Sequence, residues 1–182
     1  MEIKETNLPG VLLLEPKVYG DSRGFFAETF RDEQFKQAGI DVAFVQDNHS
    51  RSQKGVLRGL HYQLVQPQGK IVRVTRGEVF DVAVDVRKGS AHFGQWTGCL
   101  LDEQSCKALY IPPGFAHGFV VMSEVADIFY KCSDYYHPES EQGVLWNDPD
   151  IAIEWPTSDV QLSQRDSGFK RLSEHIADTL PK

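Results

Sequence analysis

Residues 70–86, KIVRVTRGEVFDVAVDV, carry the pattern that decides the fold. In the second half of this stretch apolar and polar residues alternate, which is the period of a β-strand whose successive side chains point to opposite faces. The pattern puts Phe80, Val82, Val84 and Val86 on one face and Asp81, Ala83 and Asp85 on the other, as in a half-buried strand. Gly77 is typical of a turn. We therefore predict a β-hairpin made of residues 70–76 and 79–86.

Other short strands follow on both sides of turn residues. We expect them at residues 95–101, 107–111, 118–122 and 125–132. Strands so close together, with few helices between them, favour a mainly β fold, an antiparallel sandwich or jelly-roll barrel. Helices are expected only at the periphery. One should cover residues 32–38, and an amphipathic one should cover about 168–180, where Phe169, Leu172, Ile176 and Leu180 have helical spacing.

Length and composition favour one globular domain. The chain has 182 residues, of which 41% are hydrophobic and 25% charged, so we expect a single domain over residues 1–182 with its barrel core at about 45–150. No apolar run approaches the roughly 20 residues that cross a bilayer, and the start MEIKE lacks the features of a secretory signal. The three cysteines form no Cys-x-x-Cys motif. We expect a cytoplasmic protein with free thiols and no membrane contact.

The charge distribution points to a small anionic ligand. A net charge of -7 argues against a general nucleic-acid binder, because most of the surface would repel a phosphate backbone. Residues 51–76 nevertheless hold six basic residues and no acidic one. This basic strip suits a small anion, although a solvated basic face without a partner would give the same pattern.

Two histidine segments have the residue types of a catalytic pocket. In RGLHYQ, residues 58–63, Arg58 and His61 differ in strand parity, so a bulge near Gly59 is needed for both to line one cavity. The segment PPGFAH, residues 112–117, matches the second half of the cupin pattern Pro-x-Gly-x-x-His and predicts a cupin-type barrel. Two histidines without a nearby carboxylate fall short of the three protein ligands usual for a transition metal. We therefore expect a site without a metal and not a metal-dependent oxygenase.

Five blocks together resemble one family of enzymes. The blocks are GDSRGFFAE at residues 20–28, QDNHS at 46–50, GVLRGLHYQ at 55–63, QGK at 68–70 and YKCSDYY at 130–136. In this order they are similar to the dTDP-4-dehydrorhamnose 3,5-epimerase family, and the resemblance runs from about residue 20 to residue 166. It implies a cofactor-independent isomerase that acts on dTDP-4-dehydro-6-deoxy-D-glucose to give dTDP-4-dehydro-L-rhamnose.

The resemblance also implies four catalytic residues. A proton beside a ketone is weakly acidic, so its removal needs a base and a group that stabilises the enolate oxygen. By resemblance His61 is the base, Asp166 orients it, and Lys70 stabilises the enolate. Tyr130 would return a proton to the opposite face of the sugar, although a tyrosine at a barrel rim is otherwise commonly a packing residue.

The remaining implied residues bind the substrate. Arg58 would hold the diphosphate through its planar guanidinium, and His117 would shape the sugar pocket. The other residues implied to contact the nucleotide are Arg23, Phe26, Glu28, Gln46, Asn48 and Tyr136. Some of these contacts come in this family from the N-terminal part of a second subunit, which implies a homodimer.

Two other functions use the same residues. A single-site epimerase of an antibiotic-sugar pathway can keep the same His, Asp, Lys and Tyr, and one sequence hardly separates it from a double epimerase. A catalytically idle cupin that binds sugar nucleotides would leave the set of base, orienting acid, enolate-stabilising lysine and tyrosine unexplained.

Overall fold

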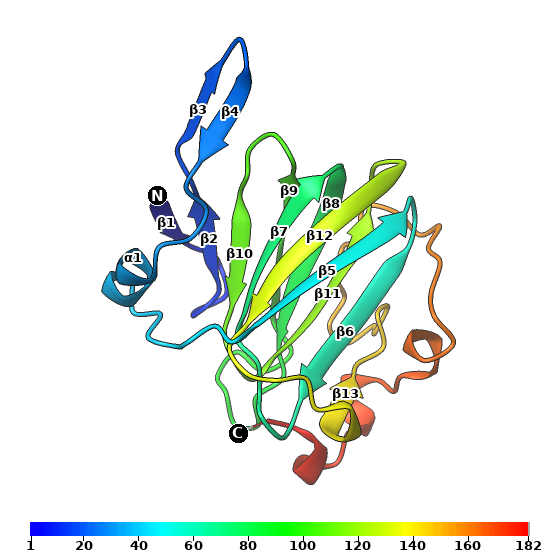
Figure 1. Cartoon of the computed structure of the whole chain (residues 1–182). Coiled ribbons are helices and arrows are strands. Elements are labelled where there is room, and N and C mark those ends of the chain that lie inside the picture. The colour runs from blue at the N-terminus through cyan, green and yellow to red at the C-terminus, as the bar shows by residue number, and fades with distance from the viewer. Residues whose placement is uncertain (182) are drawn as a thin grey trace.

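Two antiparallel β-sheets lie face to face in the computed structural model, which describes residues 1–181 (Figure 1). The six-stranded sheet has the order β1 (Glu2–Glu5), β2 (Leu12–Glu15), β10 (Ala108–Ile111), β7 (Lys70–Arg76), β12 (Val125–Cys132) and β5 (Gln46–Gln53). The five-stranded sheet has the order β13 (Glu141–Gly143), β6 (Leu57–Gln63), β11 (Phe115–Val121), β8 (Glu78–Asp85) and β9 (Trp96–Asp102). The predicted mainly β, antiparallel jelly-roll architecture is confirmed.

The predicted hairpin between residues 70–76 and 79–86 is wrong. Both strands exist, but β7 pairs with β10 and β12 in one sheet, whereas β8 pairs with β9 and β11 in the other. The chain crosses between the sheets at Gly77, which has φ +77° and no room for a Cβ atom, since one would lie 2.1 Å from the Val125 carbonyl oxygen. Alternation therefore identifies the strands without identifying their partners.

Strand β8 is buried on both faces, not on one. Val82 and Val84 pack in a core cluster with Ile151 and Leu172 of the C-terminal segment. Val79 and Ala83 belong to a second cluster, between the sheets. Asp81 and Asp85, expected on an outer face, are fully buried, and each has a partner that satisfies its charge: the buried His117 for Asp81 and the half-buried Arg87 guanidinium for Asp85.

The ends of the chain differ from the expectation. The barrel begins before residue 45, because β1 and β2 extend the six-stranded sheet next to β10. The predicted helix over 168–180 is replaced by three 3-10 turns, η2 (Asp166–Gly168), η3 (Leu172–Glu174) and η4 (Ala177–Thr179). Besides the short backbone bonds within these turns, the segment bonds to residues that follow β13: the Leu172 N–H donates to the Asp148 carboxylate, and the Lys170 carbonyl accepts from the Leu145 N–H.

Two further elements lie outside the sheets. The predicted helix at 32–38 is present as α1 (Asp32–Gln37) and packs Phe35 against the outer face of the six-stranded sheet; a further 3-10 turn, η1, spans Pro138–Ser140. The hairpin of β3 (Val18–Asp21) and β4 (Gly24–Ala27) projects from the body, and Phe26 at its surface is 67% exposed (Figure 1). No helix in residues 1–181 has the length and apolar character needed to cross a membrane.

Candidate active site

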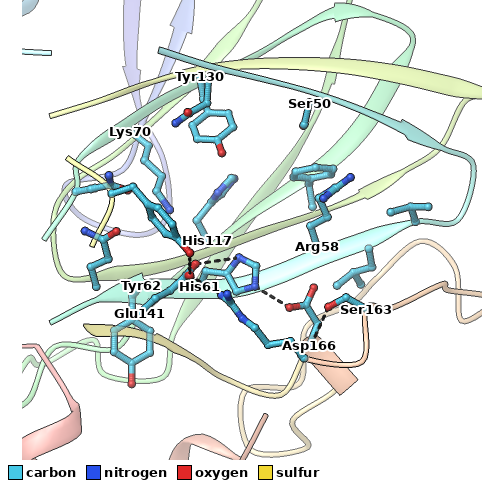
Figure 2. A pocket seen from close by; sticks show the side chains of 18 of the residues that line it. Ser50, Arg58, His61, Tyr62, Lys70, His117, Tyr130, Glu141, Ser163 and Asp166 are labelled. Carbon is cyan, nitrogen blue, oxygen red and sulfur yellow. Dashed lines mark hydrogen bonds and ion pairs between the residues drawn. The ribbon is translucent and has the colours of Figure 1, made fainter. Parts of the chain in front are cut away.

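A cavity of about 690 Å³ lies between the two sheets and is lined by both (Figure 2). Nine of the twelve predicted site residues line it: Gln46, Asn48, Arg58, His61, Lys70, His117, Tyr130, Tyr136 and Asp166. These residues come from strands and turns far apart in the sequence. The sequence therefore identified most of the polar lining of one pocket.

The six-stranded sheet supplies one wall through the register of its strands. Tyr130 on β12 is paired with Asn48 on β5, and Cys132, two residues further on, is paired with Gln46 on β5 and Lys70 on β7. Paired residues, and residues two apart on one strand, share a face of the sheet. The side chains of Gln46, Asn48, Lys70 and Tyr130 therefore point toward the same cavity.

The predicted irregularity near Gly59 is confirmed and brings Arg58 and His61 to the opposite wall. His117 on β11 pairs with His61, and Phe119 pairs with Arg58. An advance of two residues on β11 therefore lies opposite an advance of three residues on β6. The extra residue reverses the parity of the strand, as a bulge does. Gly59 has φ +114°, and a Cβ atom there would lie 2.5 Å from the His117 carbonyl oxygen, so this close approach needs glycine.

A buried carboxylate orients the His61 imidazole. Nε2 of His61 lies 2.8 Å from Oδ1 of Asp166, which is 4% exposed. Burial raises the pKa of Asp166, but the hydrogen bond from His61 and the nearby imidazole outweigh burial and leave the pKa of this carboxyl below its usual range. An ionised Asp166 accepts the Nε2 proton, so Nδ1 is the nitrogen that is left to accept another proton.

An amine and a phenol face this imidazole from the other sheet. Figure 2 shows Lys70 and Tyr130 on the side of the pocket opposite His61 and Asp166. Burial lowers the pKa of the Lys70 ammonium, although the nearby Cys132, Glu141 and Asp81 act in the other direction. Burial also raises the pKa of the Tyr130 phenol, which keeps it protonated near neutral pH. The pocket thus holds a proton acceptor and a proton donor on opposite walls.

A second histidine–carboxylate pair lies beside the first. Nε2 of His117 is 2.9 and 3.1 Å from the two carboxylate oxygens of the fully buried Asp81. Each histidine therefore has its own carboxylate partner. Within residues 1–181 no three side chains of His, Cys, Asp or Glu gather as metal ligands would; the expected independence from metals and cofactors stays a prediction.

Sequence reasoning missed several residues of the pocket, Glu141 foremost. Glu141 on β13 accepts a hydrogen bond from the Tyr136 hydroxyl at 2.6 Å, and its other close partner is the Arg165 guanidinium at 2.7 Å. Its second oxygen is 3.8 Å from Nδ1 of His61. No pattern around residue 141 marks this glutamate. Asp81 carried a signal that could have been used, because Asp81 and Asp85 are two acidic residues in the otherwise apolar run at residues 79–86.

Three predicted residues lie away from the pocket. Arg23 and Phe26 belong to the projecting hairpin, and Glu28 follows it. None of the three lines the cavity. Arg23 is paired with Asp21, and Glu28 with Arg31. Within one chain the structure therefore separates these residues from the other nine.

A jelly-roll barrel with an oriented imidazole, a buried ammonium and a phenol around one internal pocket belongs to the class of cupin-like enzymes that move protons on a small ligand. Comparison with known proteins makes this specific. The family model described as dTDP-4-dehydrorhamnose 3,5-epimerase matches residues 5–174. The chain belongs to the dTDP-4-dehydrorhamnose 3,5-epimerase family, as the sequence blocks predicted.

Individual relatives agree with the family model. A dTDP-4-dehydrorhamnose 3,5-epimerase of Pseudomonas aeruginosa is 52% identical over 183 residues, covering 100% of both chains. One of Neisseria gonorrhoeae is 58% identical over 162 residues, which are 89% of this chain but 49% of that protein, so the chain spans about half the length of that relative. A solved 3,5-epimerase of Legionella pneumophila Philadelphia 1, in complex with dTDP-4-keto-L-rhamnose, has 54% identity and a TM-score of 0.97, over 100% of this chain and 97% of that one.

Proposed function

We propose that this protein inverts carbons 3 and 5 of dTDP-4-dehydro-6-deoxy-D-glucose to give dTDP-4-dehydro-L-rhamnose without a cofactor. The observation that carries the proposal is the placement of an Asp166-bound His61 on one wall of the pocket and Tyr130 on the other. Inversion requires a proton to leave one face of a carbon and return to the other. A base and an acid on opposite walls meet that requirement.

His61 and Lys70 perform the first half of each inversion. Nδ1 of His61 takes the proton from the carbon beside the ketone, and the electron pair of the C–H bond moves into an enolate whose oxygen is that of carbon 4. Asp166 stabilises the imidazolium that forms, since it accepts the Nε2 proton. The Lys70 ammonium, partly desolvated in the pocket, stabilises the negative oxygen more than it would in water.

Tyr130 performs the second half. Its phenol delivers a proton to the opposite face of the planar enolate, and the C–H bond forms with inverted configuration. The phenolate then takes a proton from solvent, and His61 loses its proton to solvent. The raised pKa of Tyr130 supports this role, because the phenol keeps its proton until the enolate needs it.

The basic strip has a place in this proposal. Arg58 lines the pocket, and its Nε donates to the Ser52 hydroxyl at 3.0 Å, which leaves the outer nitrogens of the guanidinium for the diphosphate. Gln46 and Asn48 form the neighbouring wall, and His117, fixed by Asp81, borders the sugar. Tyr136, at the rim, offers an aromatic face to the thymine base.

We also propose a homodimer in which the β3–β4 hairpin completes the partner's pocket. The hairpin exposes Tyr19, Phe25 and Phe26, at 55, 63 and 67% of their surface, and such clustered aromatic exposure is typical of an interface. Arg23, Phe26 and Glu28 would then contact the nucleotide bound to the other subunit. A cytoplasmic location is proposed with it, consistent with the three free cysteines.

Product analysis tests the proposed reaction. The protein is incubated with dTDP-4-dehydro-6-deoxy-D-glucose and an NADPH-dependent 4-keto reductase specific for the L-rhamnose configuration, and the product is identified by NMR. We expect dTDP-L-rhamnose. A product inverted at only one carbon would assign the chain to single-site epimerases, and no inverted product would contradict catalysis by this pocket.

A further inference from the structure

The position opposite His61 on the neighbouring strand holds no side chain. Gly143 on β13 is the register partner of His61 on β6, so a side chain at residue 143 would lie on the same face as the imidazole. A Cβ atom built on Gly143 would be 2.2 Å from the ring of Phe169, and its three nearest atoms all belong to that ring. The Phe169 ring therefore fills the space that a cross-strand side chain would occupy.

This ring contacts the imidazole directly. The ring centres of His61 and Phe169 are 5.6 Å apart, and the planes meet at 82°, an edge-to-face arrangement. Phe169 follows Asp166 by three residues and is the C-cap of the turn η2. One short turn thus presents two groups to one imidazole: a carboxylate to Nε2 and an aromatic ring to its side.

A second cavity lies on the far side of Phe169. It has a volume of about 340 Å³ and is lined by Gly143, Phe169, His175 and Ile176 among others. Among residues 1–181, Glu141 is the one residue that lines both this cavity and the active-site cavity, and His61 lines only the latter. Phe169 therefore lies between the imidazole and the second cavity.

The backbone around Phe169 is fixed to the barrel. Its neighbour Lys170 forms a bridge with Val144 and accepts a hydrogen bond from the Leu145 N–H at 2.9 Å. The Arg165 guanidinium lies 5.8 Å from the centre of the Phe169 ring. A ring held in this way can restrict an imidazole that packs against it.

We propose that Phe169 is a positioning residue for the epimerisation: its ring fixes the orientation of His61 and separates the imidazole from water in the second cavity. The inference rests on the proposed role of His61 as the base and deepens it. It has two consequences. Proton abstraction slows when the ring is lost, and the proton held by His61 exchanges more readily with solvent.

The first test compares three single variants with wild type. We expect Phe169→Ala to lower kcat about 10-fold or more with KM changed less than about 3-fold, because small misplacement of a reacting group costs much of the rate. Phe169→Leu should restore at least about a third of kcat, since leucine refills most of the space. The matched control is Phe93→Ala, at a surface turn and 41% exposed, which should match wild type. Thermal unfolding of each variant checks the fold.

The second test uses the contact between Gly143 and the ring. Gly143→Ala should lower kcat as much as Phe169→Ala, because its methyl group displaces the ring. The double variant Gly143→Ala/Phe169→Ala should be no slower than Phe169→Ala alone, because the obstructing ring is gone. Losses that multiply in the double variant would overturn the inference.

The third test is isotopic and separates positioning from general damage. In deuterated water, substrate recovered before completion is analysed for deuterium with retained configuration. We expect the ratio of this label to inverted product to rise at least about 3-fold in Phe169→Ala, because an unshielded imidazolium exchanges before it returns its proton. If Phe169→Ala has the same ratio of label to inverted product and the same kcat as the wild-type protein, the inference about Phe169 is overturned, whereas the proposed function is not affected. Absence of deuterium from the product of the wild-type protein refutes the proposed function instead.

Discussion

Nε2 of His61 and Oδ1 of Asp166 are 2.8 Å apart, although 105 positions separate the two residues in the chain. The carboxylate accepts the Nε2 proton and so selects Nδ1 as the basic nitrogen. Asp166→Asn keeps the shape but not the charge of this partner. We expect kcat to fall about 10²–10⁴-fold, as for other bases that lose an orienting carboxylate.

His61→Ala sets the lower limit for this comparison. Turnover should be abolished, whereas binding of dTDP, measured by calorimetry, should stay within a few-fold of wild type, because the residues proposed to contact the nucleotide lie elsewhere in the pocket. Near-normal turnover of His61→Ala would contradict the assignment of the base.

The same carboxyl predicts a pH effect on stability. The pKa of Asp166 is lowered in the folded state, so its ionised form stabilises the fold at pH values above the unfolded-state pKa, and this contribution is lost as the pH falls through the folded-state pKa. We expect the free energy of unfolding of Asp166→Asn to fall less on acidification below about pH 4 than that of wild type. The free energy of unfolding of both proteins is measured by urea titration at pH 7 and pH 3. An equal decrease in the two proteins would argue against this contribution of Asp166.

Tyr130→Phe should separate the two halves of the reaction. The variant keeps the ring and loses the donor, so proton abstraction by His61 continues while delivery to the opposite face fails. Inverted product should decrease at least about 10-fold more than exchange of label into recovered substrate. Equal losses of exchange and inversion would count against Tyr130 as the acid.

Lys70 combines a catalytic gain with a cost in stability. Burial lowers its pKa, so the charged form destabilises the fold; this cost is complete below the folded-state pKa and disappears as the pH rises from there to the unfolded-state pKa. Lys70→Met should therefore lose most activity while its free energy of unfolding stays equal or rises by about 1–4 kcal/mol. A clear decrease in unfolding free energy would show that the lysine stabilises the fold instead.

The pH–rate profile gives an independent measurement of Lys70. The raised pKa of Tyr130 keeps the phenol protonated at alkaline pH, so loss of the Lys70 charge should set the alkaline limb of kcat/KM. Lys70→Arg should move that limb to higher pH, because arginine stays charged. An unmoved limb in an active Lys70→Arg variant would assign it to another group.

Mixed dimers test the contribution of the hairpin. An Arg23→Ala/Phe26→Ala variant lacks the proposed nucleotide contacts, and His61→Ala lacks the base. After random subunit exchange, half of the dimers carry one complete site, so activity should recover to about a quarter of wild type. The control mixes His61→Ala with Asp166→Asn. Each subunit contributes both of these residues to its own pocket, so no mixed dimer has a complete site and activity should not recover. Absence of recovery in the first mixture would contradict sharing of the pocket between subunits.

The sequence predicted strands well and their partners poorly. Alternation at residues 79–86 identified β8, but it contains no information on the crossing at Gly77, because pairing depends on strands far away in the chain. The helical spacing at 168–180 was overruled by bonds to the barrel, and Ile176, expected on an apolar face, is 68% exposed. The assignment of residues 1–182 to one domain stays a prediction.

The site was predicted mainly through resemblance, with one physical requirement added. The parity of Arg58 and His61 demanded an extra residue near Gly59, and the register of β6 against β11 confirms it. Glu141 and Phe169 were not foreseen as neighbours of His61, because each arrives from a separate segment through tertiary packing. Local sequence reports which side chains a strand presents, but not what other segments place beside them.

Positional deuterium incorporation tests the central claim most directly. The wild-type protein is incubated with dTDP-4-dehydro-6-deoxy-D-glucose in deuterated water, and the isolated product is analysed by NMR and mass spectrometry. The account predicts deuterium at both carbon 3 and carbon 5, each with inverted configuration. Deuterium at one carbon only would contradict double epimerisation, and deuterium at neither would contradict proton transfer by His61 and Tyr130 altogether.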